Sequence, residues 1–98
     1  MINNIEEYKI AILEIIEELL PGCKVQLFGS RARKDFSEGS DIDLAIDAGF
    51  PIDYKKIYAL KEKFEESTIP LFIDIVDINS ADEKIKNEIK RDGIVWKN

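Results

Sequence analysis

The chain has 98 residues, of which 45% are hydrophobic and 35% charged, a composition typical of one soluble globular domain and not of a disordered chain. Its formal net charge of −6 argues against broad nucleic-acid binding, which depends on lysines and arginines gathered against phosphates. The sequence has no histidine and one cysteine, Cys23, which excludes an internal disulfide, a zinc site and a histidine-based catalytic triad within this chain. We interpret Cys23 as a structural residue.

No apolar stretch reaches the roughly 20 residues that a membrane-spanning helix requires. The first residues also lack the basic, apolar and small-residue order of a secretory signal. A single cysteine agrees with a reducing compartment. We therefore expect one cytoplasmic domain, covering residues 1–98, that does not engage a membrane.

The first predicted element is an amphipathic helix over residues 4–20. Its apolar side chains recur at helical spacing, and Asn4 and Glu7 are placed as a capping pair. Pro21-Gly22 is expected to end the helix. A short apolar strand over 24–28 follows.

This strand runs into Gly29 and Ser30, and a short helix is predicted over about 30–35. Gly29 allows close backbone approach, and the Ser30 hydroxyl can act both as helix N-cap and as a hydrogen-bond donor to a phosphate. The helix N–H groups and the positive end of its dipole would face the same anion. Arg31 and Arg33 can add charge-assisted hydrogen bonds. The turn therefore predicts a nucleotide-binding set of Gly29, Ser30, Arg31 and Arg33.

A serine- and glycine-rich loop over 37–40 leads into a second predicted strand, 41–47, which carries Asp41 and Asp43. Alternate strand residues share a face, so both carboxylates project together while their apolar neighbours enter the core. Carboxylates held this close repel one another, and a bound cation would let both stay ionised. Oxygen ligands of this kind suit Mg²⁺, which binds one or two carboxylates together with substrate phosphates.

A second amphipathic helix is predicted over 53–66, with Asp53 as its N-cap, and a third strand over 71–77. That strand holds Asp74 between isoleucines and Asp77 at its exit. A carboxylate among isoleucines in mid-strand is costly unless it is paired, and a metal ion would provide the pairing. We predict Asp74 as third metal ligand or base and Asp77 as structural. The alternative is an edge strand with a solvated face.

The last long helix is predicted to open at the capping box Ser80-x-x-Glu83 and to end at Gly93. The segment 94–96 is expected to form either a short strand or a docking tail. Alternating helices and strands predict an α/β protein (α+β in stricter schemes) in which helices pack on a small mixed or parallel sheet.

These motifs resemble those of the DNA polymerase β-like nucleotidyltransferases. The closest likeness is to the minimal nucleotidyltransferases (MNT), which form the antitoxin half of HEPN–MNT toxin–antitoxin pairs. The resemblance rests on Gly-Ser-x10-Asp-x-Asp, from Gly29 to Asp43, and on the later segments 72–77 and 91–96. It covers essentially the whole chain and implies a single minimal nucleotidyltransferase domain with a two-ion Mg²⁺ site. The catalytic and metal-binding residues that it implies are Asp41, Asp43 and Asp74.

The resemblance also implies a function. It predicts a Mg²⁺-dependent enzyme that uses ATP to transfer AMP to a protein hydroxyl, with a tyrosine of a partner HEPN ribonuclease toxin as the expected acceptor. The alternative is a module that binds ATP without catalysis and inhibits its partner by contact. The intact set of three carboxylates argues against this alternative, because a pure binding module could lose any of them. A GTPase-like phosphate site is disfavoured, because no Gly-x4-Gly-Lys-Ser/Thr motif occurs.

Overall fold

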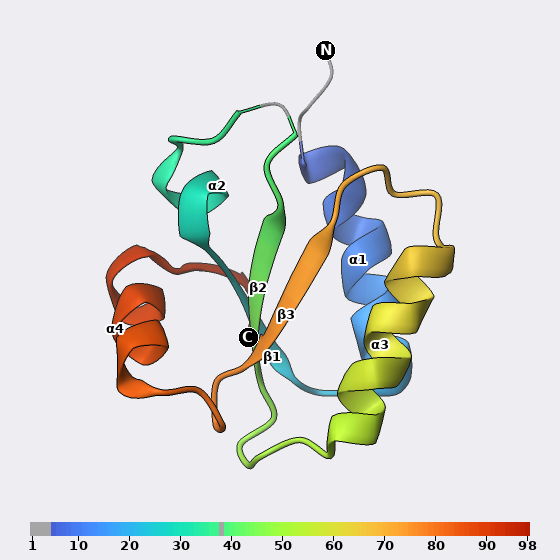
Figure 1. Cartoon of the computed structure of the whole chain (residues 1–98). Helices are drawn as coiled ribbons and strands as arrows, with labels where there is room; N and C mark the ends of the chain where they lie inside the picture. The colour runs from blue at the N-terminus through green and yellow to red at the C-terminus, as the bar shows by residue number, and fades with distance from the viewer. Residues whose placement is uncertain (1–4, 38) are drawn as a thin grey trace.

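The computed structural model describes residues 5–37 and 39–98. Within these residues helices and strands alternate along the chain, as predicted (Figure 1). In chain order the elements are α1 (Glu6–Leu19), β1 (Lys24–Phe28), α2 (Gly29–Arg33), β2 (Ile42–Asp47), α3 (Tyr54–Glu66), β3 (Ile73–Asp77), α4 (Glu83–Asp92) and β4 (Ile94–Lys97).

The strands form one mixed sheet in the order β3-β2-β1-β4. β1 is antiparallel to both β2 and β4, whereas β2 and β3 run parallel. A parallel pair needs a crossover connection, and α3 provides it. The expected α/β class with a small mixed sheet is confirmed, and the segment after α4 is the edge strand β4.

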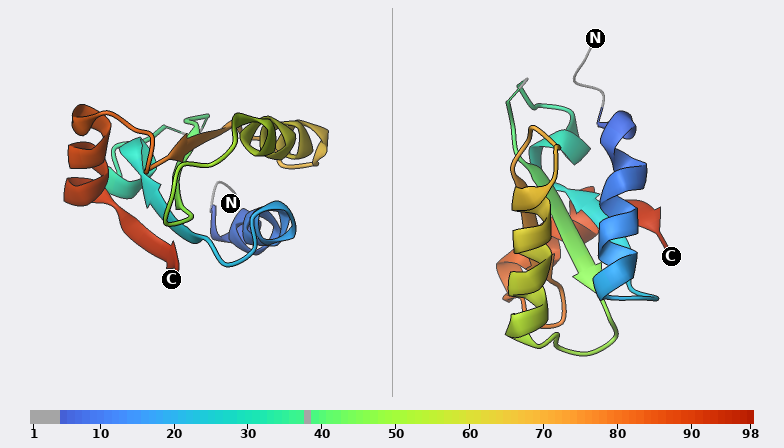
Figure 2. Two further views of the ribbon diagram at one scale, coloured as in Figure 1. Left: turned by 90° about the horizontal axis from the view of Figure 1, so that it is seen from below. Right: turned by 90° about the vertical axis from the view of Figure 1, so that its right-hand side faces the viewer.

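Helices cover both faces of the sheet: α1 and α3 lie on one face, and α2 and α4 on the other (Figure 2). The apolar residues of β2 that alternate with its aspartates, Ile42, Leu44 and Ile46, are buried in the core under α1 and α3. A smaller cluster under α4 contains Phe28, Ala45 and Ile89. Successive side chains of a strand point to opposite faces of the sheet, so the aspartates of β2 point toward α2 and α4.

The ends of α1 and α3 agree closely with the sequence. α1 stops at Leu19, just before Pro21-Gly22, and the Asp53 side chain caps α3 by accepting the Lys55 N–H at 3.0 Å. The N-cap of α1 is Ile5, which makes no side-chain capping hydrogen bond. Asn4, the predicted cap, lies outside the described residues.

The prediction that α4 opens at Ser80 was wrong. Asp82 is the N-cap, and its side chain accepts the Ile85 N–H at 2.9 Å. Ser80 lies in the preceding turn, where its hydroxyl donates to Asp77. A carboxylate at Asp82 also interacts more favourably than a hydroxyl with the positive end of the helix dipole, which explains the choice of cap.

Gly93 follows the last residue of α4, as predicted, but its φ of −64° is not left-handed. Glycine is needed here for space, because a Cβ would collide with the Gln26 side chain and the Ile89 carbonyl. Beyond Gly93, Trp96 of β4 is buried in the main core. Among the described residues, no helix has the length and apolar character required to cross a membrane.

Candidate active site

Three strand ends meet at one edge of the sheet, at the top of Figure 1. β1 ends there, and β2 and β3 begin there, because β1 is antiparallel to β2 and β2 is parallel to β3. In the row of paired residues at this edge, Asp43 lies between Phe28 of β1 and Asp74 of β3. Residues paired across neighbouring strands share a face, so Asp43 and Asp74 project together toward α2 and α4.

The pKa of Asp43 is shifted by its burial and by the carboxylates around it. Its pKa is raised to about 6, first by burial and then by the negative charges of Asp74, Asp41 and Glu88, with a partial offset from Arg33. An ionised Asp43 is therefore unfavourable in the protein alone. A bound cation would remove that cost.

Asp74 is the second residue of β3, because the strand begins at Ile73, two residues later than predicted. It is therefore not a mid-strand residue, and it is only partly buried. Asp41 precedes β2 and is exposed.

The carboxylates at this edge form only part of a metal site. Across residues 5–37 and 39–98, no three acidic or cysteine side chains come close enough, as they stand, to hold a metal ion. The paired carboxylates of Asp43 and Asp74 nevertheless offer the hard oxygen atoms that Mg²⁺ prefers. The full ligand set of Asp41, Asp43 and Asp74 stays a prediction.

Gly29 packs directly against Asp43. Its φ is +76°, in the left-handed region that L side chains avoid, and a Cβ at this position would collide with the Asp43 carboxylate. Only glycine allows the backbone to turn from β1 into α2 at this distance from Asp43.

Ser30 is the second residue of α2, and the prediction that it is the N-cap was wrong. Phe28 is the N-cap, without a side-chain hydrogen bond, because the helix already begins at Gly29. The Ser30 carbonyl accepts the Asp35 N–H at 3.1 Å. Its partly buried hydroxyl is not used for capping, and phosphate binding by Ser30 stays a prediction.

Arg31 has a different environment from the one expected. Its side chain is 3% exposed, its Nε donates to the Ser40 carbonyl at 3.1 Å, and its guanidinium carbon lies 4.6 Å from the centre of the Phe36 ring. These contacts hold the loop that leads to Asp41. The geometry gives no support to nucleotide binding by Arg31, which stays a prediction.

Arg33, by contrast, pairs with three carboxylates outside the predicted set. Its Nε is 3.0 Å from Asp35, and its Nη1 is 3.5 Å from Glu88 and 3.7 Å from Asp92. These carboxylates raise its pKa, Asp35 most strongly through a hydrogen bond. Its positive charge also reaches Asp43. Of the two predicted arginines, Arg33 is the one whose charge acts on a predicted site carboxylate, Asp43.

Asp77 belongs to the opposite end of β3. Its carboxylate accepts the Ile52 N–H at 2.8 Å, the Asn79 N–H at 3.1 Å and the Ser80 hydroxyl at 2.9 Å. It therefore joins the segment before α3 to the turn before α4. This geometry agrees with the structural role predicted for Asp77.

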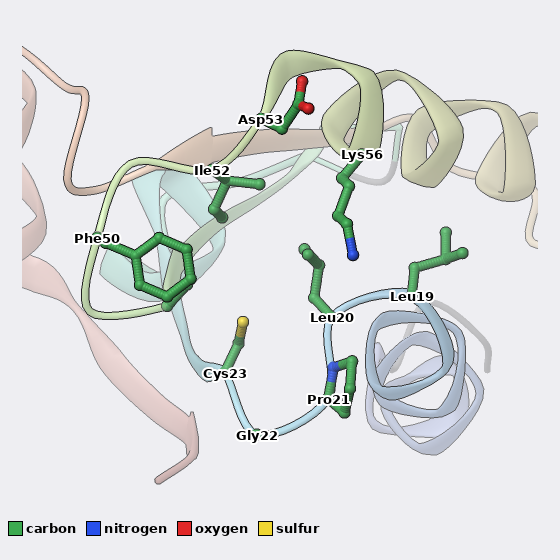
Figure 3. Close-up of a pocket in the computed structure, with 10 residues that line it drawn as sticks. Leu19, Leu20, Pro21, Gly22, Cys23, Phe50, Ile52, Asp53 and Lys56 are labelled. Carbon is green, nitrogen blue, oxygen red and sulfur yellow. The ribbon is translucent and has the colours of Figure 1, made fainter.

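An apolar cavity of about 260 Å³ also lies at that opposite end, where β1 begins and β2 ends (Figure 3). Leu20, Cys23, Phe50 and Lys56 are among the residues that line it. Cys23 is buried, and burial raises the pKa of its thiol, which disfavours the nucleophilic thiolate. The cavity contains none of the predicted site residues.

Comparison with known proteins identifies the family of the chain. Residues 11–97 match the family described as "Polymerase beta, Nucleotidyltransferase". The chain belongs to this nucleotidyltransferase family. The resemblance predicted from the Gly29–Asp43 motif is thereby confirmed, and the chain is an enzyme of the nucleotidyltransferase class.

Individual relatives agree with this assignment. The nucleotidyltransferase is 34% identical, over 90% of its length and 78% of the relative's, to the "Probable protein adenylyltransferase MntA" of Haemophilus influenzae. A chain of a toxin–antitoxin crystal structure with AMP-PNP has a TM-score of 0.78 at 25% identity, over 90% of this chain and 71% of that one. A chain from the structure of a tri-AMPylated Shewanella oneidensis HEPN toxin in complex with MNT antitoxin shares the fold. Its TM-score is 0.74 at 23% identity, over 93% of this chain and 70% of that one.

Two acidic residues that pair with Arg33 were not predicted from the sequence. Glu88 and Asp92 lie on α4, 55 and 59 positions after Arg33, and nothing in their local pattern points to the motif. Their spacing of four residues places both on one face of α4, but it does not reveal that this face meets α2.

Proposed function

We propose that this nucleotidyltransferase is Mg²⁺-dependent and transfers AMP from ATP to a tyrosine hydroxyl of a partner HEPN toxin, thereby acting as an antitoxin. The observation that carries the proposal is the cross-strand pair of Asp43 and Asp74 beside Gly29. The similarity to a relative named as a protein adenylyltransferase supports adenylyl transfer to a protein. The likeness to toxin–antitoxin structures supports the choice of partner.

The proposed nucleotide site lies at the turn between β1 and α2. The triphosphate would approach the Gly29 backbone, with the Ser30 hydroxyl as a hydrogen-bond donor. Arg33 would provide charge-assisted hydrogen bonds, which are stronger than neutral ones. This arrangement would put the α-phosphate on the same face of the sheet as Asp43 and Asp74.

In the proposed reaction the acceptor oxygen attacks the α-phosphorus of ATP. The bond from that phosphorus to the oxygen bridging to the β-phosphate breaks, and pyrophosphate leaves with the electron pair. Asp74 accepts the proton of the hydroxyl as it attacks. Mg²⁺ held by Asp41, Asp43 and Asp74 would offset the negative charge of the phosphates. Positioning and electrostatics supply most of the rate enhancement in such transfers.

The test is to incubate the protein with ATP labelled on its α-phosphate, Mg²⁺ and the HEPN-type protein encoded beside its gene. Label is expected on the partner, and a tyrosine-to-phenylalanine change at the modified position should remove it. The double variant Asp41→Asn with Asp43→Asn should transfer nothing while keeping its circular dichroism spectrum. Undiminished transfer by the double variant would refute the proposed site. Inhibition of the partner without label would instead indicate a binding module.

A further inference from the structure

Arg33 is held by carboxylates from two parts of the chain. Asp35 is a close neighbour in sequence, but Glu88 and Asp92 come from successive turns of α4. The Glu88 and Asp92 side chains are 29% and 13% exposed, which makes Asp92 the most enclosed acidic partner of Arg33. Through these pairs, α2 is tied to the helix that packs beside it on the same face of the sheet.

The same α4 carboxylates pair with Arg33 of α2, the helix that begins at Gly29 of the proposed nucleotide site. The charge of Glu88 contributes to the raised pKa of Asp43, and the charge of Arg33 opposes that rise. Asp92 also pairs with Arg91 at 2.9 Å, so it has a second cation that would remain if Arg33 left. The guanidinium of Arg33 thus pairs directly with α4, and its charge acts on Asp43 of the carboxylate edge.

We propose that Glu88 and Asp92 are positioning residues that hold Arg33 against α4 in the nucleotide-free protein and compete with nucleotide phosphates for it. This inference rests on the proposed function, because it takes the triphosphate to bind at the β1–α2 turn. A guanidinium forms its best contacts with a phosphate by donating two parallel hydrogen bonds, and it cannot keep all of its carboxylate partners in that geometry. Nucleotide binding therefore weakens the contact between α2 and α4.

The direction of the effect follows from charge. Replacing Glu88 by glutamine removes a competitor for Arg33 and a negative charge near a polyanionic ligand, so the nucleotide should bind more tightly. Partly exposed ion pairs are weak, so the expected change in the dissociation constant is about two- to five-fold. A residue that only stabilised the fold would not tighten ligand binding when removed.

The experiment measures Mg²⁺·AMP-PNP binding by calorimetry. Glu88→Gln should tighten binding, whereas Glu83→Gln should not: Glu83 is on the same helix and carries the same charge, but its side chain is exposed and lines a different hollow. The Glu88→Gln effect should shrink in an Arg33→Gln background, because the competition requires the guanidinium. Unchanged or weaker binding by Glu88→Gln, or an equal gain in both backgrounds, would overturn the proposal.

A second measurement does not depend on the nucleotide. Urea unfolding of the parent, Arg33→Gln, Glu88→Gln and the double variant gives the coupling between the two side chains in the free protein. The changes in the free energy of unfolding are expected to be non-additive. Additive changes would show that Glu88 does not hold Arg33 in the free protein. If the parent does not bind AMP-PNP, the proposed nucleotide site fails, and the unfolding cycle alone decides whether Glu88 holds Arg33.

Discussion

At the scale of single residues, Gly29 is the position where the backbone and the carboxylates constrain one another most tightly. Gly29→Ala should lose Mg²⁺-dependent AMP-PNP binding, because the new methyl group would displace the Asp43 carboxylate. The variant should also lose about 1–2 kcal/mol of stability, because its φ is left-handed. Calorimetry and urea unfolding would measure the two effects.

Gly22→Ala is the matched control for this prediction. Gly22 has a similar φ of +82°, but a Cβ there would have nothing within 4 Å. The control should therefore lose stability to a similar extent while binding nucleotide normally. Normal binding by Gly29→Ala would show that the contact with Asp43 does not matter for the site.

The raised pKa of Asp43 predicts how the stability of the folded protein depends on pH. Its folded-state pKa of about 6 exceeds the ordinary value of 3.8, so the folded protein holds this proton more tightly than the unfolded chain does. In metal-free buffer the resulting loss of stability is absent below about pH 3.8, grows between about pH 3.8 and 6, and is complete above. Asp43→Asn should therefore be more stable than the parent at pH 7, by about 1–3 kcal/mol.

Urea unfolding at pH 4 and pH 7 with EDTA checks this prediction. The advantage of Asp43→Asn should largely disappear at pH 4, where the parent carboxyl is protonated in the folded protein. The comparison Asp53→Asn changes the exposed N-cap of α3, where asparagine caps as well as aspartate, and should show no such gain at pH 7. A constant difference between Asp43→Asn and the parent at both pH values would contradict the assigned pKa.

Asp74 and Asp77 are three positions apart, but their variants should be impaired in different assays. Asp74→Ala should abolish AMP transfer and only partly weaken ATP binding, because Asp41 and Asp43 remain. Asp77→Ala should keep transfer within a few-fold and lose about 1–3 kcal/mol of stability, since it leaves two backbone N–H groups and the Ser80 hydroxyl without their acceptor. Transfer assays and urea unfolding on both variants measure the contrast. The reverse ranking in the transfer assay would show that the site uses the other end of β3.

At the scale of elements, local chemistry made most of the fold predictable. Helical spacing located α1 and α3, and the period of two in β2 correctly separated the buried isoleucines from Asp43. Two predicted helix starts differ from the structure, and at each of them more than one residue could begin the helix. Asp82 caps α4 although Ser80 also offers an oxygen atom, and α2 begins at Gly29 instead of Ser30. At α4 the helix dipole favours the carboxylate of Asp82 over the hydroxyl of Ser80.

The candidate site was predictable only where its residues are close in sequence. Gly29 and Asp43 belong to one motif, and the structure brings them into contact. Arg31 is in the same motif, yet its side chain turns to the Ser40 carbonyl. Which side of a five-residue helix faces the site depends on packing against the sheet, and the sequence of α2 does not specify it.

At the scale of the whole molecule, the strand order creates the site and could not be derived from chain order alone. An αβαβαβ pattern also permits a fully parallel sheet, whereas here antiparallel β1 puts Gly29 at the edge where β2 and β3 begin. The mixed arrangement therefore brings into one row residues from three strands that are up to 46 positions apart, from Phe28 to Asp74. A parallel β1 would place Gly29 at the other end of the sheet.

This arrangement predicts that ligands stabilise the whole domain through that one edge. Mg²⁺·AMP-PNP at 100 times its dissociation constant should stabilise the folded state by about 2.7 kcal/mol, which raises the melting temperature of a domain of this size by roughly 10–20 °C. Mg²⁺ alone should give a smaller rise by offsetting the repulsion between Asp43 and Asp74. The double variant Asp43→Asn with Asp74→Asn should start from a higher melting temperature in EDTA and show little response to either ligand. Thermal unfolding followed by circular dichroism measures all of these shifts, with Asp47→Asn, at the far end of β2, as the control that should respond like the parent. An equal ligand shift in the double variant would place the nucleotide elsewhere on the molecule.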